Sequence, residues 1–340
     1  MKLTIGIKAL NESEHIEKVL QSALAAAAPW GGEVVLADSG STDGTVEIAN
    51  RYPVRIVQLT NFQDRSCGAG AQLAFQNALG EYFYLLDGDM VLDPGFLDEA
   101  IPLLDATPEL AGVGGQVTEV NTEGHGFKIR AMAMAGRNWR SGPVDHLDCG
   151  GLYRAEAVRS VGYLADRNLH AFEEMELGAR LRAGGWSLAR IDRHAVDHYG
   201  HQQNGYHLLL RRMRSGYAGA VGEVLRGAVG RSHLPQVLGA CTHIRNAAIV
   251  VVWWCLLLVA LLGPWSWTAG VLAFLALVGV PLAALSWRRG SLNLGMYSLV
   301  SWNVTAIGLI SGFFRHRVPA ETPLNCTVLQ DPETFSATAT

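Results

Sequence analysis

Two long uncharged stretches near the C-terminus most limit how this chain can fold. No charged residue lies between Arg245 and Arg288, in a chain that is 49% hydrophobic and 17% charged. Within this stretch, residues 246–265 and 267–287 are each about long enough to span a bilayer as a helix. Tryptophans lie at the ends of these segments, where a membrane interface favours aromatic rings: Trp265, Trp267 and Trp287. The pattern predicts a membrane-anchored protein.

A third apolar segment, Leu292 to Phe314, conflicts with the charge rule for membrane topology. If all three segments crossed, Arg315 and Arg317 would lie outside, although arginines favour the cytoplasmic side. The segment also carries polar side chains: Ser298, Ser301, Asn303, Thr305 and Ser311. We expect a third membrane-embedded helix, and leave open whether it is re-entrant, interfacial or a contact in a homo-oligomer.

The first hundred residues alternate between strand and helix patterns. Asn11 and Glu14 resemble a capping box before the first helix. This alternation predicts an α/β fold with a Rossmann-like, mainly parallel sheet, covered by helices on both faces, whose ligands bind at the carboxyl ends of the strands. The expected strands are Leu3–Ala9, Glu33–Ala37, Val54–Leu59 and Tyr82–Leu86, and the expected helices are Val19–Ala28, Thr42–Arg51 and Gly70–Leu79.

The fourth expected strand runs directly into two carboxylates, Asp87 and Asp89, separated by Gly88. A buried aspartate is costly unless it is paired or bound to a metal. Residues two apart on a strand share one side, so both carboxylates can face one ion. The motif therefore predicts a Mg²⁺ or Mn²⁺ site that holds a substrate's phosphates. The alternative is a solvated turn at the end of a strand.

A second polar segment, Asp38 to Asp43, follows the second expected strand. Its Ser-Gly turn allows the backbone to approach a ligand closely. A carboxylate fixed at the end of a strand, such as Asp38, can accept hydrogen bonds from a base or a ribose. A polar loop with a helix cap at Ser41 or Thr42 is the alternative interpretation.

These two motifs and three further ones occur in a recognisable order along about the first 215 residues. They are Leu10-Asn11-Glu12, Asp38-Ser39-Gly40-Ser41-Thr42-Asp43, Asp87-Gly88-Asp89, Cys149-Gly150-Gly151-Leu152-Tyr153-Arg154, and Phe172 to Leu181 followed by Gly184-Gly185-Trp186. Together they resemble the successive motifs of the family 2 glycosyltransferases. The resemblance implies a GT-A fold and transfer of a sugar, with inversion, from a UDP- or GDP-sugar with Mg²⁺ or Mn²⁺.

The resemblance also implies roles for individual residues. Glu174 matches the base that deprotonates the acceptor hydroxyl, and Glu173 is its substitute if the alignment slips by one residue. Helix-surface ion pairs of Glu173 and Glu176 with Arg180 are the alternative. The donor nucleotide would contact Asn11, Glu12, Asp38, Gln72, Asp87 and Gly88, the metal would contact Asp87, Asp89 and His198, and the sugars would contact Gly150, Gly151 and Trp186.

Two departures from the family pattern refine this expectation. The segment Gly70 to Phe75 lacks the usual basic residue and asparagine, so those contacts are missing or come from Arg65. The Gln-x-x-Arg-Trp signature of processive synthases does not occur in the sequence, which favours the addition of a single sugar.

The segment from Tyr206 to Leu225 has apolar residues at near-helical spacing, interrupted by arginines. It predicts an amphipathic helix at the membrane surface, with a core helix as the alternative. Arg211 and Arg214 could contact a donor diphosphate or a lipid phosphate, or could serve only as topological anchors.

We therefore expect four regions: a catalytic domain over 1–205, an interfacial helix and linker over 206–240, a membrane region of about three helices over 241–317, and a poorly ordered tail over 318–340. The expected location is the bacterial inner membrane, with a cytoplasmic catalytic domain and a polyprenyl-linked or other lipid-linked acceptor. A polyprenyl-phosphate sugar synthase and a non-catalytic scaffold are the alternatives. The net charge of −4 argues against a nucleic-acid partner, and the five cysteines show no spacing typical of zinc or disulfides.

Overall fold

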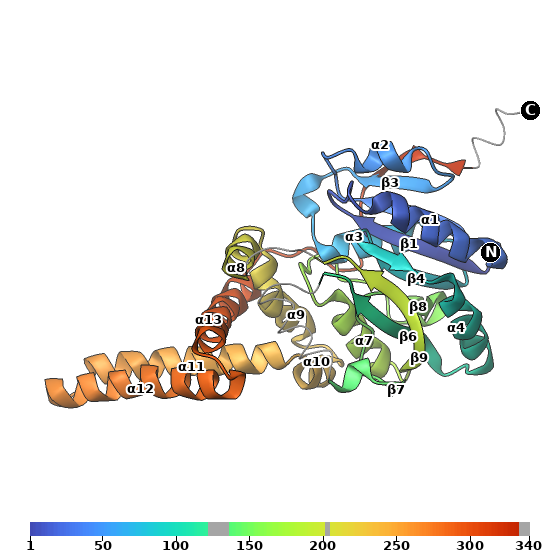
Figure 1. Cartoon of the computed structure of the whole chain (residues 1–340). Coiled ribbons are helices and arrows are strands. Elements are labelled where there is room, and N and C mark those ends of the chain that lie inside the picture. Colours follow the sequence, from blue (N-terminus) through green and yellow to red (C-terminus); the bar gives the residue numbers. More distant parts are fainter. Residues whose placement is uncertain (122–135, 201–204, 333–340) are drawn as a thin grey trace, which may run out of the picture. The chain divides into compact units, whose positions relative to one another are not determined.

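The computed structural model describes residues 1–121, 136–200 and 205–332, which form two compact units. The first, called the catalytic unit after the role expected from the sequence, comprises the described residues up to 200 together with 317–332. The membrane unit comprises residues 205–316. Figure 1 shows the helices and strands of both units, and each unit is described here by itself.

A mixed sheet forms the centre of the catalytic unit. Its parallel half has the order β3-β2-β1-β4, which confirms the strands predicted for the first hundred residues. Ala9 pairs with Asp38 and Lys8 pairs with Asp87, so the carboxyl ends of β1, β2 and β4 lie at one level. The strands are β1 (Leu3–Ala9), β2 (Glu33–Asp38), β3 (Arg55–Leu59) and β4 (Tyr82–Asp87).

The other half of the sheet is less regular. β8 is antiparallel to both β4 and β6, β9 is parallel to β6, and β5 and β7 are antiparallel to β9. The sheet is therefore mainly parallel only in its first half. These strands are β5 (Met90–Leu92), β6 (Leu110–Glu119), β7 (Gly142–Pro143), β8 (Gly151–Arg154) and β9 (Ser187–His198).

Helices cover both faces of this sheet, as predicted, and enclose two hydrophobic clusters. One face is covered by α1 (Ile16–Ala27), α2 (Thr45–Ala49) and α4 (Pro94–Ala106), and the other by α3 (Cys67–Gln76), α6 (Ala155–Ser160) and α7 (Glu173–Ala183). Short 3-10 turns occur at η1 (Ala28–Trp30), η2 (Phe62–Asp64) and η3 (Arg137–Trp139).

The predicted capping box at Asn11 is wrong. The first helix begins only at Ile16, and Asn11 lies in the left-handed region with φ of 59°. Its side chain accepts a hydrogen bond from Thr42 N at 2.8 Å instead, so it joins two loops. The third helix begins at Cys67 rather than Gly70, because Ser66 caps it by accepting from Ala69 N at 2.8 Å.

The prediction of a poorly ordered tail is wrong for the part that the structure describes. β10 (Cys326–Gln330) is antiparallel to β3 and extends the sheet at its edge. Before it, Arg317 forms an ion pair with Asp166 at 2.6 Å, and Leu324 is buried in a hydrophobic cluster. Residues 333–340 of the expected tail lie outside the described residues.

The membrane unit is helical, and the expected amphipathic helix over 206–225 is broken within it. α8 (Gly205–Arg214) ends before Gly216, whose φ is 83°, and η4 (Tyr217–Gly219) leads into α9 (Ala220–Ala228). α10 (Leu234–Ala240) follows. Among the described residues, three helices are long and apolar enough to cross a membrane: α11 (Thr242–Leu262), α12 (Trp267–Arg289) and α13 (Leu292–Phe313).

Candidate active site

Asp38 organises the loop that follows β2. The residue is fully buried, and its Oδ2 accepts hydrogen bonds from Gly40 N at 2.8 Å, Ser41 N at 3.0 Å and Gln58 Nε2 at 2.8 Å. Arg65 supports the same loop by donating from Nε to Ser39 O at 2.6 Å. Asp38 therefore holds the loop after β2 in place, and its contact with the nucleoside stays a prediction.

The loops after β1, β2 and β4 meet at the carboxyl edge of the sheet. Glu12 N donates to Thr45 Oγ1 at 2.9 Å, and Asn11 N donates to Ser41 Oγ at 2.8 Å. Gly88 lies so close to Glu12 that an added Cβ would approach Glu12 Cγ within 2.7 Å. The structure thus brings together Asn11, Glu12, Asp38, Asp87 and Gly88, all predicted to contact the donor.

Lys8, at the end of β1, joins two of the predicted acids. Its Nζ lies 3.1 Å from Asp87 Oδ1 and 2.5 Å from Glu173 Oε1. Burial alone would lower the pKa of Lys8, but Asp87 and Glu173 outweigh it and hold this pKa well above 10.5. The sequence interpretation missed this residue, although a lysine within an otherwise apolar strand was the available signal.

Glu174 lies in a different environment from its neighbour. Its carboxylate accepts hydrogen bonds from Cys149 N and Gly150 N, each at 3.2 Å. Cys149 and Gly150 have φ of 61° and 87°, which turns both amides towards this acid. Burial raises the pKa of Glu174 well above 4.5; Lys8 opposes the shift, while Asp148, Asp87 and Glu173 add to it. Glu174 therefore takes up a proton more readily than an exposed glutamate does.

His198 lies between two carboxylates at the end of β9. Its Nδ1 is 2.9 Å from both carboxylate oxygens of Glu119, and its Nε2 is 3.4 Å from Asp89 Oδ2. With the proton on Nδ1, the arrangement is the one seen at metal-binding histidines, where a carboxylate orients the ring. Glu119 was not predicted. Its contact with His198 joins residues that are 79 positions apart.

The predicted metal ligands fit a divalent ion only in part. Asp89 and His198 supply an oxygen donor and a nitrogen donor side by side: the carboxylate suits Mg²⁺ or Mn²⁺, and the imidazole suits a transition metal. Asp87 instead faces Lys8, and its pKa is raised mainly by burial. In the described part of the chain, no group of three or more His, Cys, Asp or Glu side chains is already arranged around one ion position.

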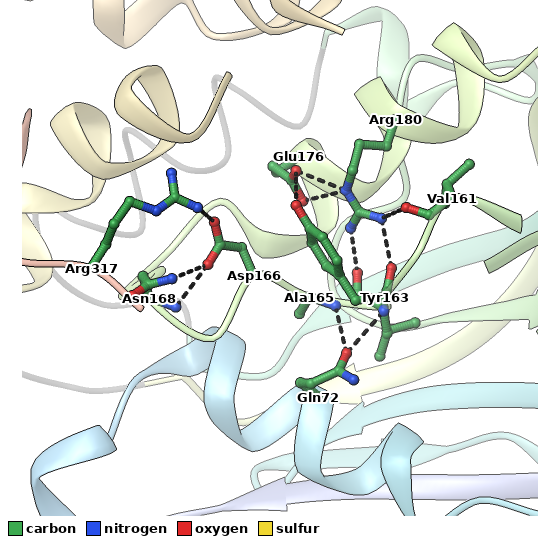
Figure 2. Close-up of polar contacts among 10 residues, drawn as sticks. Gln72, Val161, Tyr163, Ala165, Asp166, Asn168, Glu176, Arg180 and Arg317 are labelled. Carbon is green, nitrogen blue, oxygen red and sulfur yellow. Dashed lines mark hydrogen bonds and ion pairs between the residues drawn. The ribbon is translucent and has the colours of Figure 1, made fainter. Parts of the chain in front are cut away.

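Gln72 lies apart from these residues, in the cluster that Figure 2 shows. Its Oε1 accepts hydrogen bonds from Leu164 N at 2.9 Å and Ala165 N at 3.2 Å, so Gln72 has a structural role, and its contact with the donor stays a prediction. In the same cluster Arg180 pairs with Glu176 at 2.8 Å. The expected ion pair on the helix surface is therefore buried, and Glu173 does not take part in it.

Trp186 is also separated from the predicted sugar site. It precedes β9, whereas His198 ends this strand, so about eleven residues of roughly 3.3 Å each lie between them. Its Nε1 donates to Ser160 Oγ at 3.1 Å, and its ring packs against a hydrophobic cluster. Gly150 and Gly151, in contrast, lie beside Glu174 and at the start of β8.

Arg211 and Arg214 belong to α8 of the membrane unit. They line a cavity of about 590 Å³ together with His207, Leu210 and Ser215. The cavity therefore combines two guanidinium groups with a leucine side chain, which suits a phosphate attached to an apolar group.

Comparisons with known proteins show similarity to glycosyltransferases. The model of glycosyl transferase family 2 matches residues 4–161. The succinoglycan biosynthesis protein ExoA of Rhizobium meliloti is 29% identical over 210 residues, which cover 57% of this chain and 62% of ExoA. A dolichol-phosphate mannosyltransferase of Pyrococcus furiosus is 24% identical over 115 residues, covering 33% of this chain and 32% of that protein. Both matches span less than two thirds of the relative's length.

Solved structures share the fold at low sequence identity. The mannosyltransferase PcManGT of Pyrobaculum calidifontis, solved with GDP-Man and Mn²⁺, has a TM-score of 0.61 at 20% identity, covering 90% of this chain and 87% of that one. Residues 1–349 of TarS from S. aureus give 0.51 at 16% identity, covering 92% and 91%. Residues 4–161 are therefore similar to glycosyl transferase family 2, and they lie within a unit that has a GT-A-like fold.

Proposed function

We propose that the protein is an inverting, metal-dependent glycosyltransferase that moves one sugar from a UDP- or GDP-sugar to a hydroxyl of a lipid-linked acceptor during glycan assembly. The observation that carries this proposal is the contrast between Glu173 and Glu174. Glu173 is ion-paired with Lys8, whereas Glu174 is held by two backbone amides and has a raised pKa.

A raised pKa suits a general base. A sugar hydroxyl is a weak nucleophile at neutral pH, and a carboxylate whose pKa lies nearer the working pH accepts its proton more effectively during attack. The acceptor oxygen forms a bond to the anomeric carbon and the bond from that carbon to the donor diphosphate breaks. The hydroxyl proton passes to Glu174 Oε. Attack on the face opposite the leaving group inverts the anomeric centre.

Asp87, Asp89 and His198 would hold a divalent ion on the donor diphosphate. When bound, such an ion stabilises the negative charge that develops on the leaving group. Lys8 forms ion pairs with both Asp87 and Glu173, so its single positive charge offsets part of their negative charge. Glu119 orients the imidazole of His198 through Nδ1.

The membrane unit supports a lipid-linked acceptor. The α8 cavity with Arg211 and Arg214 offers a place for the lipid's phosphate or diphosphate. The same cavity favours a second candidate, a polyprenyl-phosphate sugar synthase in which a lipid phosphate is the nucleophile. A phosphate oxygen requires no strong base, so the importance of Glu174 distinguishes the two. A non-catalytic scaffold is disfavoured by the complete set of acids at the sheet edge. We place the enzyme at a bacterial inner membrane with its catalytic unit in the cytoplasm.

The proposal is tested with the purified full-length chain and a panel of UDP- and GDP-sugars. We expect one donor to raise the melting temperature in the presence of Mn²⁺ and to undergo slow hydrolysis, and a chelator to remove both effects. A mixture of polyprenyl diphosphate-linked sugars and polyprenyl phosphate then tests the acceptor. Failure of every nucleotide sugar to bind or react would exclude the proposed function.

A further inference from the structure

The chain leaves the catalytic unit and later returns to it. Residues 205–316 form the membrane unit, and from Arg317 the chain is again part of the catalytic unit. Cys326 pairs with Leu59 and Val328 pairs with Val57 where β10 joins the sheet. An open β-sheet cannot cross the hydrocarbon interior of a bilayer, because the backbone groups at its edges would have no hydrogen-bond partners there. All strands of this sheet therefore lie on one side of the membrane. Both ends of the membrane unit must therefore lie on one side of the membrane.

Further contacts hold the returning segment in place. Arg317 pairs with buried Asp166 at 2.6 Å, and Asn168 Nδ2 donates to Val318 O at 2.8 Å. Gln330 Nε2 donates to Val54 O at 2.9 Å. Side-chain and backbone contacts over more than ten residues thus hold the returning segment to the catalytic unit. It does not depend on the short β10 strand alone.

This connection sets the parity of the membrane crossings. Three helices between the two ends are long and apolar enough to span, yet the number that span must be even. At least one of α11, α12 and α13 therefore does not cross. An even number of crossings follows for either orientation of the catalytic unit, because the described residues up to 200 and those from 317 share this one folded unit.

The properties of the helices indicate which pair crosses. α11 and α12 have 21 and 23 residues and a mean hydropathy of 2.2 each. At 1.5 Å per residue they reach about 32 Å and 35 Å, enough for a hydrocarbon core of about 30 Å. α13 has a mean hydropathy of only 1.3. Arg288 and Arg289 at the end of α12 would return to the starting side.

α13 packs against helices that precede the first span. Gly308 and Gly312 lie against the backbone carbonyls of Ala218 and Gly219 so closely that no side chain fits there. Arg315, just after α13, forms an ion pair with Glu223, which is buried in α9. Because α9 precedes α11, this contact places the last turns of α13 beside a charged helix on the catalytic side.

The distribution of charge supports the same arrangement. Residues 205–316 contain nine arginines, one glutamate, and neither lysine nor aspartate. Anionic lipid headgroups attract these arginines. Arginines also favour the cytoplasmic side of a membrane, where we expect the chain to enter it. Apart from Arg245, in the first turn of α11, none lies within the interior of α11 or α12. The arginines are Arg211, Arg212, Arg214, Arg226, Arg231, Arg245, Arg288, Arg289 and Arg315.

We propose that α11 and α12 form a transmembrane hairpin, and that α13 lies in the bilayer interface on the catalytic side together with α9. The partner of α13 is the acyl region just below the headgroups. An exposed apolar stripe at spacings of three, four and seven residues would face it: Leu292, Met296, Val300, Ile307, Ile310 and Phe314. This inference concerns topology and does not rest on the proposed function.

Single cysteines in a cysteine-free full-length chain test the crossings, using a membrane-impermeant maleimide on sealed vesicles of known orientation. Glu14→Cys marks the catalytic side. We expect Ser291→Cys and Thr327→Cys to react from that side and Ser266→Cys only from the other. Reaction of Thr327→Cys from the side opposite Glu14→Cys would overturn the parity argument, and exchanged sidedness of Ser266→Cys and Ser291→Cys would overturn the choice of helices. Reaction of all four from one side would exclude the hairpin.

Depth measurements test the placement of α13. A nitroxide at Ile307→Cys is compared with one at Val280→Cys in the middle of α12, both on exposed side chains. We expect the α12 label to report the bilayer centre and the α13 label to report a position about 5–10 Å below the headgroups. Equal depth at the centre for both labels would contradict an interfacial α13.

Discussion

Two clusters of buried charge in the catalytic unit differ in how completely their charges are matched. In the cluster of Figure 2, Arg180 pairs with Glu176, donates to three backbone carbonyls and stacks on the Tyr163 ring 3.8 Å away. Asp166 is likewise paired with Arg317. Each acid has its own arginine, and the cluster joins α7, the loop before it and the returning C-terminal segment.

At the carboxyl edge of the sheet the balance is different. Asp87 and Glu173 share one lysine, and burial, followed by the charges of nearby acids, raises the pKa of Glu174. Such an excess of negative charge is costly to the fold and suits a site that binds cations and accepts protons. Buried charge therefore does not identify an active site by itself. An incomplete match of buried charge is the more informative signal.

Asp89→Asn should produce the largest effect on activity. The substitution removes the carboxylate beside His198 and with it an oxygen donor for the metal. Loss of electrostatic stabilisation at a leaving group costs about 10²- to 10³-fold or more in rate, so we expect transfer to fall at least about 10³-fold. Donor titrations with and without Mn²⁺ should also lose their metal dependence.

Asp197→Asn is the matched control for this change. Asp197 immediately precedes His198 on β9, and its exposed side chain forms an ion pair with His194. We expect its activity and melting temperature to remain near those of the wild type. Full activity of Asp89→Asn, or of the wild type in excess chelator, would refute the metal site.

Glu174→Gln separates the two neighbouring acids. The change keeps the shape of the side chain and removes the charge, so donor affinity should remain near normal while single-turnover transfer slows by about 10²- to 10⁴-fold. Glu173→Gln should slow the chemistry much less, because Glu173 is already neutralised by Lys8. The reverse ranking would move the base to Glu173. An undiminished rate in both variants would favour a phosphate acceptor.

Arg180→Met tests the completely matched cluster. Removing one partner of a buried ion pair leaves the other charge unpaired, which costs about 3–5 kcal/mol of stability. Transfer per folded molecule should be nearly unchanged. Arg182→Met on the same helix removes a more exposed pair with Asp145 and should cost at most about 1 kcal/mol. A specific loss of turnover in folded Arg180→Met would assign this cluster to the active site.

The sequence was sufficient for features that are local. The parallel half of the sheet follows from alternating apolar runs, and the edge residues Asn11, Asp38 and Asp87 follow from motifs at the ends of those runs. Trp186 precedes the start of β9, whereas His198 ends this strand, so the sequence motif alone did not indicate how far apart these two predicted site residues lie.

Features that depend on distant pairing were missed. Lys8 meets Glu173 across 165 positions, and Gln76 meets Leu324 across 248. The local sequence of β10 does not predict that its five residues extend the sheet, because this strand is stabilised by pairing with β3 at the sheet edge. The parity of the membrane crossings was unresolved for the same reason, since hydropathy describes each helix and not the return of the chain.

The smallest expected effect is that of Glu174 on the stability of the folded protein. It tests the electrostatic difference between the two clusters. The folded protein holds the Glu174 proton more tightly than the unfolded chain does, because the folded pKa is raised above 4.5. The free energy of unfolding should therefore fall as pH rises from about 4.5 through the folded pKa. Glu174→Gln removes this penalty, so the variant should be more stable than the wild type at neutral pH. Melting curves from pH 4 to 8 should show the difference shrinking towards acid pH, whereas Glu176→Gln, which breaks a matched pair, should be destabilised at neutral pH. A Glu174→Gln variant that is less stable than the wild type at neutral pH would show that the charge of Glu174 does not destabilise the folded protein.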